Sequence, residues 1–121
     1  MDYVDPIRKA GLSLLNAPGN DLVAACALAA AGAHIVLFTT GRGTPFACPV
    51  PTMKIASNTA LATKKANWID YNAGRVLDGV GFEGCTDELF NLIMEVAGGK
   101  RVHSEKLDKT DIAIFKDGVT L

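Results

Sequence analysis

A Gly-Arg-Gly turn after an apolar run is the part of this sequence best suited to chemistry. Residues 38–44 read Phe-Thr-Thr-Gly-Arg-Gly-Thr and end the apolar run 33–38, which is typical of a buried strand. The guanidinium of Arg42 can bind a carboxylate through two parallel hydrogen bonds, and Gly41 and Gly43 allow backbone N–H groups to approach an anion closely. The pattern indicates a site for an acidic small molecule. A tight turn that carries a surface arginine is the alternative.

Motifs for several common chemistries are absent. The turn at 18–21 reads Pro-Gly-Asn-Asp, so it lacks the Gly-x-Gly-x-x-Gly dinucleotide fingerprint, and no phosphate loop or nucleophile elbow occurs. The three cysteines are expected to be free thiols in a reducing compartment, without a nearby histidine that would make a catalytic pair. His34 is expected to be structural and His103 solvated. The two histidines do not have the spacing of metal ligands, so no recognisable complete metal site is expected in this chain.

Composition narrows the class of protein. The 121 residues suit a single domain over 1–121, and 49% apolar with 21% charged residues is typical of a globular chain. A net charge of -1 argues against nucleic-acid binding. Residues 22–38 are apolar, but they are rich in alanine, are interrupted at Gly32, and fall short of the roughly 20 residues that a membrane span requires. The first residues do not form a signal peptide, so a cytoplasmic protein is expected.

Strands that alternate with helices are predicted along most of the chain. Asn20 suits the N-cap of a helix over 22–31 that stops at Gly32. This alternation predicts a three-layer, Rossmann-like α/β domain with a mostly parallel sheet and no dinucleotide fingerprint. The other predicted elements are strands at 11–15, 33–39, 52–57 and 68–71, helices over 59–66 and from an N-cap at Thr86 to Gly98, a loop over 100–110, and a hairpin or tail strand over 112–121.

Polar side chains gather where the predicted strands end. Ligands of parallel α/β sheets bind beyond the carboxyl ends of the strands. Asn and Asp there also suit turns and helix caps, which is the alternative interpretation. Lys54, within a predicted strand, is expected to face solvent, with an anion partner as the alternative. The predicted substrate-binding residues are Thr39, Thr40, Gly41, Arg42, Gly43, Asn20, Asn58, Asp70 and Asn72.

The strand-end segments resemble the C-terminal region of the altronate dehydratase/galactarate dehydratase family. The order and spacing also match, and the similarity covers almost the whole chain from about residue 11. The Thr-Thr-Gly-Arg-Gly block is the most distinctive part. The matching segments are 15–21, 38–44, 54–59 and 69–74, followed by a closing helix and tail at 89–93, 97–99 and 104–105.

The resemblance implies part of a hydro-lyase that dehydrates a sugar acid, such as D-altronate to 2-keto-3-deoxy-D-gluconate in hexuronate breakdown. Such enzymes remove the proton next to the carboxylate and expel the β-hydroxyl, with a divalent metal, usually iron(II), that stabilises the intermediate. By this resemblance Arg42, with Gly41 and Gly43, would bind the carboxylate with help from Thr39 and Thr40. The catalytic base and the metal ligands have no counterpart that can be named in this chain. Hydroxyl contacts would come from Asn20, Asn58, Asp70 and Asn72.

Relatives in this family are several times longer than the present chain. The resemblance therefore implies a C-terminal domain expressed alone or one piece of a split enzyme, inactive without its remaining domains or subunits. A homo-oligomer is compatible with this. A non-catalytic α/β binding or assembly module is the alternative from a different class. Sulfolactate sulfo-lyase shares the family's sequence features, so a sulfo-lyase is a further alternative.

Overall fold

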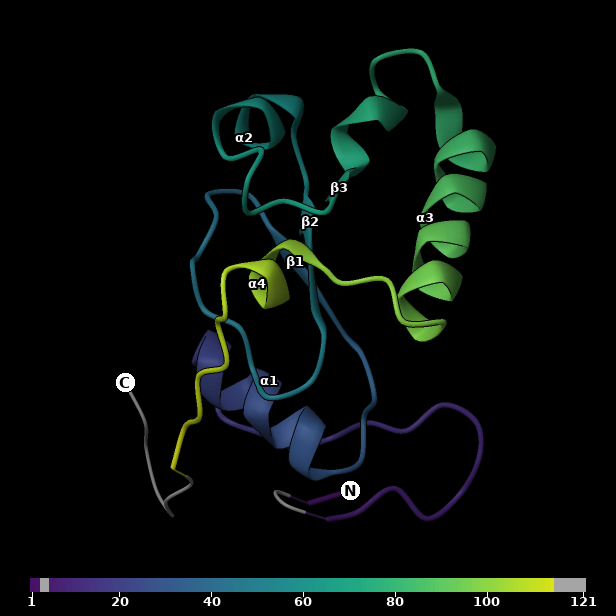
Figure 1. Ribbon diagram of the computed structural model, residues 1–121. Coiled ribbons are helices and arrows are strands. Elements are labelled where there is room, and N and C mark those ends of the chain that lie inside the picture. The colour runs from purple at the N-terminus through teal and green to yellow at the C-terminus, as the bar shows by residue number, and fades with distance from the viewer. Residues whose placement is uncertain (3–4, 115–121) are drawn as a thin grey trace.

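Three parallel strands form the sheet of the domain, in a computed structural model that describes residues 1–2 and 5–114 (Figure 1). The strands are β1 (Val36–Thr40), β2 (Thr52–Ala56) and β3 (Tyr71–Asn72), in the order β1-β2-β3. Val36 lies opposite Thr52, and Ile55 lies opposite Tyr71. The helices are α1 (Asp21–Ala30), α2 (Thr59–Lys64), the 3₁₀ helix η1 (Ala73–Val76), α3 (Gly81–Ala97) and α4 (His103–Lys106).

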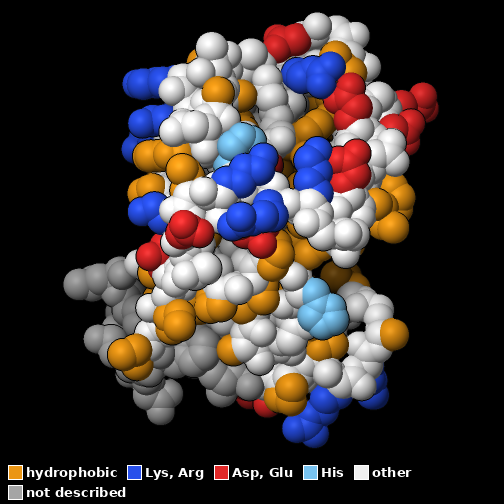
Figure 2. Space-filling model, viewed as in Figure 1, with side chains coloured by type: hydrophobic (Ala, Val, Ile, Leu, Met, Phe, Trp, Pro, Cys, Tyr) orange, Lys and Arg blue, Asp and Glu red, His pale blue; other side chains and the backbone are white. Residues whose placement is uncertain are grey.

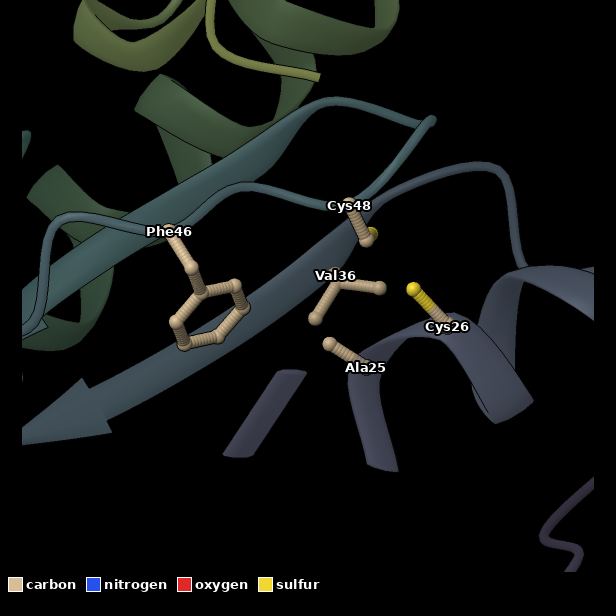
Figure 3. Packing of buried hydrophobic residues seen from close by; sticks show 5 residues of the cluster. All are labelled: Ala25, Cys26, Val36, Phe46 and Cys48. Carbon is tan, nitrogen blue, oxygen red and sulfur yellow. The ribbon is translucent and has the colours of Figure 1, made fainter. Parts of the chain in front are cut away.

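Helices cover both faces of the sheet, which confirms the predicted α/β layering. On one face, Ala25 and Cys26 of α1 pack against Val36 of β1, with Phe46 and Cys48 from the loop after β1 (Figure 3). Side chains alternate along a strand, so every second residue of β2 points toward the opposite face of the sheet. Met53 and Ile55 accordingly pack against α3, in clusters that contain Val96 and Cys85.

Helix α1 forms where the sequence predicts it. The Asn20 side chain accepts a hydrogen bond from the backbone N–H of Val23 at 3.3 Å, and Asp21 lies in the positively polarised first turn. Gly32 follows the C-cap residue with φ +108°, a left-handed conformation that glycine adopts without steric cost. Both ends of α1 therefore follow from local capping chemistry.

The predicted strand at 11–15 is wrong. That segment has no strand structure, and Leu12 and Leu14 are 95% and 78% exposed. An apolar run becomes a strand only where a neighbouring strand satisfies its backbone groups. The βαβ unit predicted from 11 to 39 is therefore absent, and the βαβ unit of this domain is β2–α2–β3.

The second half of the chain departs from prediction at the ends of its elements. Thr86 is not an N-cap, because α3 begins at Gly81 and buried Cys85 packs its first turns against the sheet. The predicted loop 100–110 contains α4, and residues 112–114 are not a strand. The rest of the predicted hairpin, 115–121, lies outside the described residues.

All three cysteines are buried, unpaired thiols, as the sequence predicts. Cys26 and Cys48 lie in the cluster between α1 and β1, and Cys85 packs beside Ile55. Within the part of the chain that the structure describes, no helix is long and apolar enough to cross a membrane.

Candidate anion-binding site

Polar side chains link the loops at the carboxyl ends of the three strands. The Asn58 side-chain amide donates to the Gly41 carbonyl at 3.0 Å, and its Oδ1 accepts from Leu61 N at 2.8 Å. The side-chain amide of Asn72 donates to Thr59 Oγ1 at 3.1 Å. The structure therefore brings Gly41 and Asn58 together and ties Asn72 to the first residue of α2, as expected for neighbouring parallel strands.

The last of these loops requires a glycine. A Cβ atom at Gly74 would lie 2.5 Å from Thr59 N and 2.8 Å from Asn58 Cα, far inside van der Waals contact. The Gly74 N–H also donates to Asn72 Oδ1 at 3.0 Å. The backbone of η1 therefore lies in direct contact with the start of α2, and a side chain at position 74 would push the two segments apart.

Arg42 is an exposed cation on the loop that follows β1. Its side chain is exposed and forms no hydrogen bond or ion pair with the described residues. The loop that carries it is held by the Gly43 N–H, which donates to Thr40 Oγ1 at 2.9 Å. Thr39 is exposed on the same strand end. The guanidinium is therefore available to an external anion, on a loop whose own backbone is fixed.

Two predicted site residues lie elsewhere. Asn20 caps α1. The Asp70 carboxylate is 5% exposed and accepts from Lys54 N and His103 N, each at 2.8 Å. Its Oδ1 also lies 2.7 Å from His103 Nδ1. Asp70 thus faces inward, where it holds the start of α4 against β2.

The expectation that His103 is solvated is wrong. Its side chain is about one-third exposed (36%) and its Nδ1 faces the Asp70 carboxylate. The tautomer of the His103 ring sets which of the two atoms donates in this contact. Beside the ring lies a pocket of about 210 Å³ whose lining includes Lys100, Arg101 and Lys106. Figure 2 shows blue side chains gathered around a histidine on this face.

The prediction that Lys54 faces solvent is also wrong. This residue is 3% exposed, and its Nζ donates to the Thr44 carbonyl at 2.6 Å. The ammonium lies 4.0 Å from the ring centroid of Phe46 and 5.1 Å from that of Phe38. Burial lowers the pKa of Lys54 from 10.5 to about 8, against the opposing effect of nearby carboxylates. Lys54 stands between Met53 and Ile55 in a strand whose five residues are all buried, and its apolar neighbours are the only signal of this burial that the sequence contains.

A divalent metal does not fit the described residues. Across residues 1–2 and 5–114, no three His, Cys, Asp or Glu side chains come close enough together to hold an ion. In the described part of the chain, the pair Asp70 and His103 has no third such group close enough to complete a metal site. What the strand ends offer is a guanidinium, hydroxyls and amides, which suit an oxyanion that carries hydroxyl groups.

The family model and the similar proteins all point to the same family. Residues 1–120 match the model described as D-galactarate/Altronate dehydratase, C-terminal. The chain is 53% identical over 122 residues to altronate dehydratase of Bacillus subtilis (strain 168), covering 100% of this chain and 24% of that protein. It is 50% identical over 119 residues to altronate dehydratase of Escherichia coli (strain K12), covering 98% and 24%. To galactarate dehydratase (L-threo-forming) of Escherichia coli (strain K12) it is 38% identical over 95 residues, covering 77% and 18%. The chain thus spans about a quarter of the length of the altronate dehydratases that it matches.

Proposed function

The chain belongs to the D-galactarate/altronate dehydratase C-terminal family, and we propose that it binds the carboxylate and hydroxyl groups of a sugar acid within a hydro-lyase. The observation that carries this proposal is Arg42, an exposed guanidinium without a partner among the described residues. Thr39 and Thr40 precede it at the end of β1, and the Asn58 amide donates to the carbonyl of the adjacent Gly41. These are the groups that a polyhydroxylated carboxylate can engage.

The reaction explains why a guanidinium is useful at this place. Dehydration removes a proton from the carbon next to the carboxylate, and negative charge then moves onto the carboxylate oxygens. The β-hydroxyl departs as water once it has taken up a proton. A fixed cation at the carboxylate stabilises the charge that develops as the C–H bond breaks. Arg42 would supply that cation in this domain, while Asn58 holds its loop in place through Gly41.

The remaining parts of the enzyme would supply the rest of the chemistry. We assign the catalytic base and the divalent metal, iron(II) by resemblance, to the other domains or subunits, since the described residues do not fit a metal. The isolated chain is accordingly expected to be inactive. By the same resemblance we place the complete enzyme in cytoplasmic hexuronate breakdown, where a homo-oligomer is compatible with the proposal.

A chimera tests this assignment directly. The chain would replace the C-terminal quarter of Bacillus subtilis altronate dehydratase, to which it is 53% identical over its whole length. Arg42→Ala should lower kcat/KM for D-altronate about 100-fold, since a lost charge-assisted hydrogen bond costs about 1.5–3 kcal/mol. Arg42→Lys should recover part of the activity because it keeps the charge but not the two-pronged geometry.

The matched control is Lys64→Ala, which removes an exposed cation at the end of α2. This variant should retain the activity of the unmodified chimera. Unchanged kcat/KM in Arg42→Ala, with native circular dichroism, would refute the proposed role. Altered subunit association with unchanged kinetics would instead favour an assembly module. Turnover by the isolated chain would overturn the expectation that it needs the remaining domains.

A further inference from the structure

Lys54 is a buried cation without an ion-pair partner in the part of the chain that the structure describes. Among the described residues no Asp or Glu forms an ion pair with its Nζ. An ammonium has three N–H donors, and the Thr44 carbonyl accepts one of them. The rings of Phe38 and Phe46 supply further, weaker stabilisation. The ammonium thus retains donor capacity that no described acceptor uses.

Burial of the Lys54 ammonium lowers the stability of the folded chain. Transfer of an ammonium from water into an apolar environment is unfavourable unless a counter-charge or hydrogen bonds compensate. The carboxylates of Asp21, Asp70 and Asp111 act on Lys54 only through longer-range attraction. An anion brought to Nζ would therefore gain strongly, because both partners would meet in a region of low dielectric constant.

A pocket opens beside this ammonium. It has a volume of about 90 Å³, and the described residues that line it include two lysines and no acidic residue, with Phe46 and Trp68 as aromatic walls. Because a water occupies about 30 Å³ of liquid, the space suits roughly three waters or a carboxylate with one or two further carbons. The remaining lining residues are Thr44, Pro45, Ser104 and Leu107.

We propose that this pocket, which we call the Lys54 pocket, receives the carboxylate end of a small hydroxy acid, with Lys54 Nζ as its counter-ion. Lys109 at the lining adds a second positive charge. Thr44, which lines the pocket and accepts from Lys54 Nζ, is two residues along the chain from Arg42. The inference rests on the proposed function and deepens it, because it adds a buried carboxylate-binding pocket to the exposed guanidinium of Arg42.

The chain carries its own reporter for this pocket. Trp68 is the single tryptophan and lines the pocket, so its fluorescence should respond to a bound ligand. D-Glycerate, a three-carbon hydroxy acid, is the probe, and uncharged glycerol is the matched control ligand. The expected result is a saturable change in Trp68 emission with D-glycerate in the millimolar range and none with glycerol.

Variants identify the cation responsible. Lys54→Met should raise the Kd for D-glycerate at least tenfold, and Lys109→Met, at an exposed residue, should raise it several-fold. Lys64→Met, at an exposed residue that is not part of the pocket lining, should leave the Kd unchanged. Lys109→Met keeps the question answerable if Lys54→Met fails to fold.

Raising the pH provides a test without mutation. A lysine with a pKa of about 8 is mostly protonated at pH 7, so affinity should fall about 30-fold by pH 9.5. The groups that act on Lys54 electrostatically are Asp21, Asp70, Asp111 and Cys48, and Lys109 lines the same pocket. Any other group that titrates in this range is present in Lys54→Met as well, so comparison of the two proteins isolates the contribution of Lys54.

The proposal is overturned if D-glycerate gives no saturation in the millimolar range, if glycerol binds equally well, or if folded Lys54→Met binds D-glycerate like the wild type. A pH dependence of equal size in wild type and Lys54→Met would overturn it as well. These measurements use binding to the chain itself. They are therefore separate from the activity of the Arg42→Ala chimera, and a failure of the Lys54 pocket can be told apart from a failure of the proposed function.

Discussion

Lys54→Met isolates the energetic effect of the buried ammonium, because methionine keeps most of the side-chain length without the charge. The pKa of Lys54 falls from 10.5 to about 8 through burial, so the unfolded chain holds this proton more tightly than the folded chain. Stability rises with pH wherever the unfolded state binds more protons. For this group the rise lies between about pH 8 and 10.5.

The magnitude follows from the two pKa values. With about 8 in the folded state and 10.5 in the unfolded state, the free energy of unfolding should increase by about 2 kcal/mol between pH 7 and pH 9.5. Lys54→Met should lack this increase. The assay is urea denaturation at both pH values, followed by the fluorescence of the single tryptophan, Trp68.

Comparison with Lys54→Met removes the contribution of every other titrating group, which both proteins share. Lys64→Met should follow the wild type, since that side chain is exposed and its environment changes little on unfolding. Wild type and Lys54→Met with parallel pH dependence would refute the reasoning, because the burial of Lys54 would then carry no electrostatic cost.

Two further predictions concern the packing around the strand ends. Gly74→Ala should lower the free energy of unfolding by about 1–3 kcal/mol in urea denaturation, because the added Cβ meets Thr59 N at 2.5 Å. A loss below the error of the measurement would mean that η1 and α2 separate freely. Burial, aided by hydrogen bonds from the Tyr71 hydroxyl to Cys85 O and Glu88 Oε2, raises the pKa of Tyr71, so the stability that it contributes is complete below pH 10 and lost above it. Tyr71→Phe should therefore show a smaller decline in Tm above pH 10, and an equal decline would contradict this cause.

Capping chemistry explains which parts of the fold could be predicted from the sequence. Asn20 and Asn58 each bond a backbone N–H three residues ahead, so residues adjacent in sequence determine where α1 and α2 begin. The failures share the opposite property. The segment 11–15 lacks a partner strand, and Thr86 lies inside a helix whose early turns are held by the packing of Cys85 on the sheet.

The candidate site divides in the same way. The loop at Gly41 and the cap at Asn58 were expected to meet, because neighbouring parallel strands end at one edge of the sheet. The environment of Lys54 depends on loop residues that fold back over the strand, and the contact between Asp70 and His103 joins residues 33 apart in sequence. Periodicity within a single element contains no information about such contacts.

The inward-facing carboxylate of Asp70 also has a consequence for how the domain unfolds. Helix α4 has only four residues, too few to persist without tertiary support. Its first residue, His103, donates to the Asp70 carboxylate, and this carboxylate also accepts from Lys54 N in the middle of β2. Asp70 itself lies immediately before β3. Detachment of α4 would leave this carboxylate with unmet hydrogen bonds, and loss of β2 would release α4. The strand pair and the short helix therefore form one cooperative unit, whose amide protons should exchange with solvent together although its parts lie far apart along the chain.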